Sequence, residues 1–207
     1  MAELSKSSDS EYTKRIESER REKDHFFEEH PQSPIPWVLR EKFTGLAYFP
    51  PNPKYRIKVK LQTYPKPEPV VLATSKGIPR DMLKLGYFEF TIDGQTRRLQ
   101  VYKSIPKRGE AEDESLFVPF RDATSGKESY PAGRYLDLPV TENDEHVLDF
   151  NLAYNPYCAY NDAYVCPLPP RENWLDIRIE AGEEDFPLEA LKEQVAKEGK
   201  PLGHHHH

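Results

Sequence analysis

The dipeptide Asp93-Gly94 limits the fold of this chain more than any other feature. It separates two runs, residues 86–92 and 95–102, that have the composition and the spacing of β-strands. A two-residue type I′ turn needs positive φ at both central positions, and Asp-Gly adopts such angles at little steric cost. The sequence therefore predicts an antiparallel hairpin at this point in the chain.

Other segments extend this β pattern, and helical patterns flank it. Apolar and polar residues alternate from residue 54 to 62, so this run is expected to be a half-buried strand. Further strands are predicted at 70–74, 116–120, 134–138, 147–152 and 174–180, and helices at 11–30, 37–43 and 187–198. The expected fold is mainly β (α+β): an antiparallel sheet forming a sandwich or a small barrel, with an N-terminal helix and a short C-terminal helix.

The length of 207 residues fits one domain with a real core. The predicted organisation has four parts. They are an N-terminal helical segment packed on the body (1–42), a β-rich domain (43–183), a C-terminal helix (184–203) and the remnant of a purification tag (204–207).

Composition excludes some classes of partner. The formal net charge is −6, whereas binding to nucleic-acid phosphates needs a basic surface, so no nucleic-acid partner is expected. No apolar run is long enough for a membrane span, and residues 1–10 lack the apolar core of a signal peptide. We therefore expect a cytoplasmic protein with no membrane partner. No motif identifies a cofactor or a reaction, so the sequence does not decide whether the protein is an enzyme.

Residues 117–173 concentrate the side chains that could carry chemistry. This stretch contains both cysteines together with many tyrosines, arginines, aspartates and asparagines. Within it, Gly126-Lys127 invites comparison with a phosphate-binding loop, but Arg121 stands where the first glycine should be and Glu128 where the magnesium-binding hydroxyl should be. The motif is therefore rejected. What remains is a polar turn that either shapes the backbone or captures an anion.

Two groups in this stretch could contact a ligand. A guanidinium fixed by a carboxylate can hold an anion through two hydrogen bonds, and Arg121 and Arg134 have Asp122 and Glu128 as neighbours. The same ion pairs could equally lock a loop. Asp149 and Asn151 are expected on one face of a strand, where they either present polar groups to a cavity or fix the following loop.

Cys158 and Cys166 lie eight positions apart. A structural zinc site needs four ligands, and no third cysteine or adjacent histidine is present, so no metal is expected. The absence of a C-x-x-C motif argues against thioredoxin-like activity. A disulfide that clamps the loop and a pair of reduced thiols both remain open.

Three blocks of this region resemble the DUF1684 family, whose activity is unknown. They are FRDATSGKESYPAGRYLDL, LDFNLAYNPYCAY and CPLPPRENWLDIRIEAGE, supported by GLAYFPPNPKYR and GYFEFTIDGQTRRLQVY. The resemblance spans roughly residues 43–183 and is similar to compact prokaryotic members. Pro131 departs from the family pattern, which usually has glycine there. The resemblance implies a shared fold and a shared site built from these blocks, and it transfers no reaction.

These observations lead to one principal hypothesis and two alternatives. The principal hypothesis is that segments 117–134 and 149–173 form a pocket that binds a small polar or anionic molecule, with action on that molecule left open. The alternatives are a protein-interaction module that uses the Tyr- and Pro-rich loop 154–170, and a redox-responsive protein that uses its two cysteines. The candidate catalytic residues are Asp122, Glu128 and Asp149. The candidate ligand-binding residues are Arg121, Thr124, Lys127, Tyr130, Arg134, Asn151, Tyr154, Asn155, Cys158 and Cys166.

Overall fold

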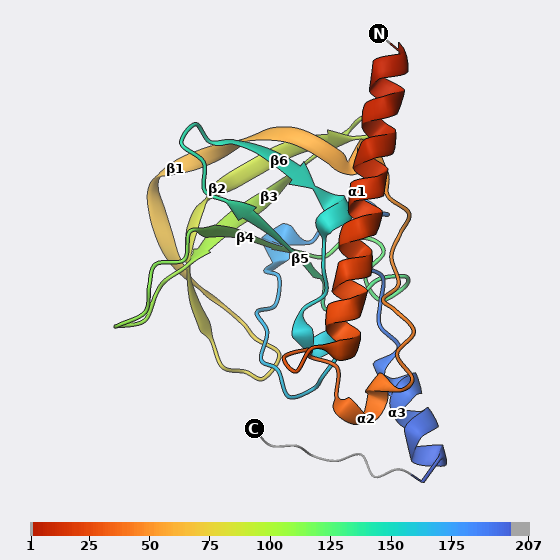
Figure 1. The fold of residues 1–207 in the computed structure, drawn as a ribbon. Helices are drawn as coiled ribbons and strands as arrows, with labels where there is room; N and C mark the ends of the chain where they lie inside the picture. Colours follow the sequence, from red (N-terminus) through yellow and green to blue (C-terminus); the bar gives the residue numbers. More distant parts are fainter. Residues whose placement is uncertain (1, 200–207) are drawn as a thin grey trace.

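Six strands form one antiparallel sheet that curls into a nearly closed barrel (Figure 1). The computed structural model describes residues 2–199, with side chains from Ser8 onward, and the expected tag residues 204–207 lie outside this range. The strand order is β5-β4-β3-β2-β1-β6, which confirms the mainly β fold and selects the barrel over the sandwich. The strands are β1 (Arg56–Leu72), β2 (Arg80–Ile92), β3 (Gln95–Ser104), β4 (Ser115–Phe120), β5 (Arg134–Pro139) and β6 (Glu145–Asp149).

The predicted hairpin is confirmed. Asp93 and Gly94 have φ angles of 50° and 76°, and Ile92 pairs with Gln95 across the turn between β2 and β3. Both angles lie in the left-handed region that a type I′ turn requires. The local chemistry of these two residues therefore fixes the register of the central strands.

β1 is one long strand where the sequence predicted two. Its first residues, Arg56 to Lys60, pair with β6, and its residues from Leu61 onward pair with β2. The register shifts between Thr63 and Glu68, and this irregularity lets the strand bend. Because β1 pairs with β6 along its first residues and with β2 along the rest, it connects these two strands in the curved sheet.

The barrel core contains the inward side chains of all six strands, joined by residues from segment 174–181. Burial alternates along this segment as predicted, with Leu175, Ile177 and Ile179 buried. However, the prediction of a strand at 174–180 is wrong, because the segment forms only scattered backbone hydrogen bonds and one isolated bridge, between Arg121 and Trp174. The segment therefore packs like a strand without joining the sheet.

Helix α1 (Ala2–Glu29) begins earlier than the predicted residue 11 and ends, as expected, before Pro31. It lies along the outside of the barrel, where Tyr12, Ile16 and Phe27 are buried (Figure 1). The shorter α2 (Trp37–Arg40) and α3 (Leu188–Lys197) form a second apolar cluster with the end of α1. The 3-10 helices are Pro53–Tyr55, Phe150–Leu152, Tyr157–Ala159 and Arg171–Asn173.

We predict that Gly86→Ala destabilises the fold strongly. Gly86 lies in β2 opposite the β1 irregularity, and a Cβ at this position would lie 2.1 Å from the carbonyl oxygen of Gln62. We expect a loss of about 3 kcal/mol in urea unfolding, at the upper end of the overpacking range. The control Gly77→Ala, which has positive φ but open space around it, should cost only about 1 kcal/mol. Equal losses would show that β1 moves away from Gly86 freely.

Candidate functional site

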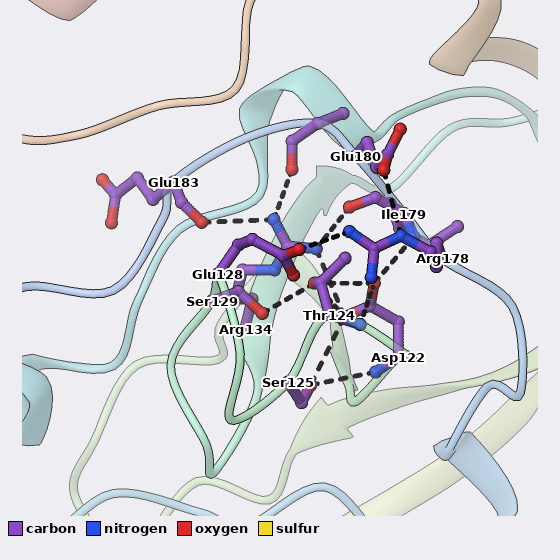
Figure 2. A network of polar contacts seen from close by, with 11 residues as sticks. Asp122, Thr124, Ser125, Glu128, Ser129, Arg134, Arg178, Ile179, Glu180 and Glu183 are labelled. Carbon is purple, nitrogen blue, oxygen red and sulfur yellow. Dashed lines mark hydrogen bonds and ion pairs between the residues drawn. The ribbon is translucent and has the colours of Figure 1, made fainter.

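Arg134 is fully buried at the start of β5, in a network that closes one end of the barrel (Figure 2). Its side chain donates to the carbonyl oxygens of Ile179 (2.9 Å), Ala181 and Glu183 (3.2 Å), and to a carboxylate oxygen of Asp122 (3.4 Å). Burial lowers the pKa of this guanidinium, and Asp122 opposes that effect. Arg134 thus ties β5 to segment 179–183, which is held by few other backbone bonds.

Asp122 organises the turn that follows β4. Its carboxylate accepts hydrogen bonds from the Thr124 hydroxyl and from the backbone amide of Ile179, the latter at 2.7 Å. The Thr124 hydroxyl also contacts that of Ser129 at 2.8 Å. Thr124 and Ser129 are buried, so their hydroxyls are internal parts of the fold, whereas residues 126–128 of the same turn are exposed.

Glu183 is the buried carboxylate at the other side of this network. It forms an ion pair with Lys23 of α1 and accepts hydrogen bonds from the Asn155 amide (2.8 Å) and the Tyr160 hydroxyl (2.5 Å). Burial and the nearby Glu183 raise the pKa of Tyr160, so the phenol keeps its proton and acts as the donor. Sequence reasoning missed Glu183, although it follows directly after the alternating run that ends at Gly182.

Asp149 and Asn151 contact each other, but the prediction that both lie on one face of a strand is wrong, because β6 ends at Asp149. The Asn151 backbone and side-chain nitrogens each donate to Asp149 at 3.0 Å, although the chain leaves β6 at Asp149 and continues as a 3-10 helix. The Tyr12 hydroxyl of α1 donates to Asp149 at 2.5 Å, and Asn151 exchanges hydrogen bonds with the backbone of Asn52. These contacts anchor α1 and the 52–55 turn.

The remaining predicted site residues lie outside these networks. Arg121 stacks over the Trp174 ring at 4.4 Å, and Glu128 forms a 2.6 Å ion pair with Arg178. The Tyr154 hydroxyl donates to Asp137. The last four are Lys127, which is exposed, and Tyr130, Cys158 and Cys166, which meet in a separate group. The predicted residues are therefore spread over several groups, and the group of Asp122, Thr124 and Arg134 contacts segment 179–183.

A cavity of about 480 Å³ lies at the opposite end of the barrel. We call this end of the barrel the mouth. It contains the first residues of β4 and β6 and the last residues of β5, whereas the Arg134 network lies beside the last residues of β4 and β6. The mouth cavity contains none of the predicted site residues. Its lining residues are Leu61, Thr63, Tyr64, Pro67, Leu83, Leu85, Lys103, Ser104, Ile105, Pro106, Glu112, Leu116, Val140, Thr141, Asp144 and His146.

His146 is the buried titratable group of the mouth, with an exposed fraction of 7%. Its Nε2 lies 3.3 Å from the Thr141 hydroxyl, and its ring packs edge-on against Phe88. Burial lowers the pKa of this imidazole, which favours the neutral form. Sequence reasoning did not select His146 as a site residue. Its even spacing from Leu148 was the signal that it faces inward.

Comparison with known proteins places these observations in a family. A family model described as "Protein of unknown function (DUF1684)" matches residues 41–184. The chain belongs to the DUF1684 family. The solution NMR structure of an uncharacterized protein from Haloarcula marismortui is 42% identical, with a TM-score of 0.64, and the match covers 84% of this chain and 95% of that one. No curated protein matches the chain.

In the described part of the chain, none of the helices is long and apolar enough to cross a membrane. Between Ser8 and Gly199, no three or more His, Cys, Asp and Glu side chains form a group that could hold a metal ion.

We predict that Arg134→Met lowers the free energy of unfolding by about 3–5 kcal/mol, because it leaves Asp122 as an unpaired buried charge. The matched control is Arg178→Met, which removes two exposed ion pairs, with Glu128 and Glu180, and should leave the urea midpoint nearly unchanged. If Arg134→Met unfolds at the wild-type urea concentration, the network does not anchor segment 179–183.

Proposed function

We propose that this protein binds a small, mainly apolar molecule carrying one hydrogen-bonding group in the mouth cavity. The observation that supports this proposal is the cavity itself, whose volume of about 480 Å³ is in the size range of small-molecule sites. Its wall contains leucine side chains from three strands, including Leu61, Leu83 and Leu116. Such a surface favours an apolar ligand because binding removes apolar area from water.

The polar groups of the mouth define the rest of the ligand. The neutral imidazole of His146 and the Thr141 hydroxyl lie together on the lining and can each donate or accept a hydrogen bond. Lys103 already forms a 2.9 Å ion pair with Glu112 at the same cavity. The cation is therefore neutralised, and an uncharged head group fits the mouth better than an anion.

This proposal moves the ligand away from segments 117–134 and 149–173. An anion between these segments would have to reach Arg134, which is fully buried and already donates to three carbonyl groups and Asp122. Binding there would require segment 179–183 to separate from β5. The mouth needs no comparable rearrangement.

The interaction-module alternative relied on exposed tyrosines in loop 154–170. Tyr160 is fully buried, and Tyr154 is bound to Asp137, whereas Tyr157 has an exposed fraction of 37%. The aromatic residues of this loop therefore contribute mainly to the interior, and the mouth offers the better-supported binding site.

Val140→Trp tests the mouth proposal. Val140 lines the cavity with 52% of its surface exposed, so a tryptophan there can fill the opening without disturbing the core. With Nile red, a neutral apolar dye with a carbonyl acceptor, we expect wild-type binding to increase the dye fluorescence. The variant should weaken binding at least about tenfold, a loss of roughly 1.4 kcal/mol.

The matched control is Val71→Trp. Val71 is a valine of similar exposure, 62%, outside the cavity lining, so this variant adds the same apolar surface elsewhere. Its dissociation constant for Nile red should stay within about twofold of the wild-type value. Equal effects of both tryptophans, or no binding by the wild type, would contradict a ligand site at the mouth.

Acidification should destabilise the wild type through His146. The unfolded chain binds a proton at this imidazole near pH 6.5, whereas the folded chain, with its lowered pKa, binds it only at lower pH. The stability that results from keeping the His146 imidazole neutral is therefore fully present above about pH 6.5 and is lost as the pH falls below that value. Urea midpoints measured from pH 8 to pH 5 should fall more for the wild type than for His146→Gln. Parallel curves would show that the ring is not held neutral.

A further inference from the structure

Cys158 and Cys166 form a pair of free thiols whose side chains hydrogen-bond each other. Cys158 is half-buried in the 3-10 helix Tyr157–Ala159, whereas Cys166 is buried. The sequence left open whether this pair is bridged. The structure shows two unbridged thiols whose side chains contact each other, and the Tyr130 hydroxyl completes the group at 3.5 Å from Cys158 Sγ.

The fold holds the two cysteines in place independently. Cys166 exchanges hydrogen bonds with Ser75, the turn residue that follows β1, at 3.0 Å and 3.1 Å. Cys158 is fixed by its neighbours Ala159 and Tyr160, which belong to the second apolar cluster beside α1. The intervening loop is therefore anchored at both ends, and the thiols meet without being covalently joined.

The surroundings distinguish the two sulfur atoms chemically. The hydrogen bond from Cys166, together with one from the Tyr130 hydroxyl at 3.5 Å, lowers the pKa of Cys158 to about 6, against the opposing effect of burial. The hydrogen bond with Cys158 raises the pKa of Cys166. Asp162 opposes ionisation of Cys158. Burial raises the pKa of the Tyr135 phenol, which donates to the carbonyl oxygen of Pro167. Cys158 is thus the accessible thiolate and Cys166 the protonated partner.

We propose that Cys158 and Cys166 form a thiol–disulfide exchange site for low-molecular-weight disulfides. Cys158 is the attacking sulfur and Cys166 the resolving sulfur. This site is separate from the mouth cavity, whose lining contains neither cysteine.

The reaction has two balanced steps. The Cys158 thiolate attacks one sulfur of the small disulfide, so that a mixed disulfide forms, the small S–S bond breaks and the first small thiolate leaves. Cys166 then transfers its proton to solvent and attacks Cys158, and the second small thiolate leaves. Two protein thiols are oxidised to one disulfide while one small disulfide is reduced to two thiols. The product closes the loop between the two anchored segments.

Glutathione disulfide and intact mass provide the test. The folded wild-type protein should lose two hydrogens and retain no glutathione. Cys166→Ser keeps the attacking thiol and should accumulate one glutathione per chain. Cys158→Ser leaves only the buried thiol and should react at least about tenfold more slowly than the wild type. If the serine at position 166 disturbs the buried site, Cys166→Ala provides the same test, because it also removes the resolving thiol.

Several results would overturn the proposal. These are no oxidation of the wild type, a stable glutathione adduct on the wild type, or Cys158→Ser reacting at the wild-type rate. Melting curves of each variant ensure that the reacting species is folded. In the oxidised wild type, closure of the loop should raise the melting temperature by a few degrees, because the bridge restricts the unfolded chain.

Tyr130 is a positioning residue in this site. Tyr130→Phe keeps the ring and removes the hydroxyl, so the pH midpoint for alkylation of Cys158 by iodoacetamide should shift upward. A purely structural role would leave this midpoint in place, and that outcome would remove Tyr130 from the exchange site.

Discussion

The buried guanidinium of Arg134 is the interaction on which the closed end of the barrel depends. Removing a charged side chain from water is costly, and this cost is offset only where its donors meet good acceptors. Arg134 meets the carbonyl groups of Ile179, Ala181 and Glu183 and the carboxylate of Asp122. A segment that is not a strand is thereby held against β5 as part of the barrel wall, and its alternate side chains complete the core.

The two ends of the barrel differ in the polarity of their side chains. At the closed end, carboxylates, amides and hydroxyls bond one another, and α1 adds Tyr12 and Lys23 to the network. At the mouth, apolar side chains line a cavity and one buried imidazole lies among them. Most polar groups of the closed end are paired, although Arg134 Nε and Asn155 Oδ1 are buried without a partner. Such a network contributes to uniqueness of the fold, whereas an apolar cavity with few polar groups can select a ligand. The binding proposal therefore concerns the mouth.

The sequence predicted the parts of the fold that depend on local chemistry. Asp93-Gly94 specified a hairpin through its own backbone preferences, and the end of α1 before Pro31 has the same origin. It did not predict that β1 is continuous, because Pro65, Pro67 and Pro69 are typical of a break. Pro65 and Pro67 lie at the register shift, where missing amide groups cost few ladder bonds, and Pro69 lies opposite Leu83 where the pairing resumes. The roles of the candidate site residues were harder to predict from the sequence than the strands. A buried arginine that binds backbone carbonyls about 45 positions away has no composition signal that distinguishes it from one that binds an anion.

We expect Arg134 and Asp122 to hold segment 177–183 as firmly as a strand. Amide hydrogen exchange at Ile179, whose backbone nitrogen donates to Asp122 at 2.7 Å, is the most direct test. This amide should exchange as slowly as those of the central strands β2 and β3, since opening it requires breaking the buried network. Exchange at the rate of the exposed loop 105–114 would show that the network does not hold the segment.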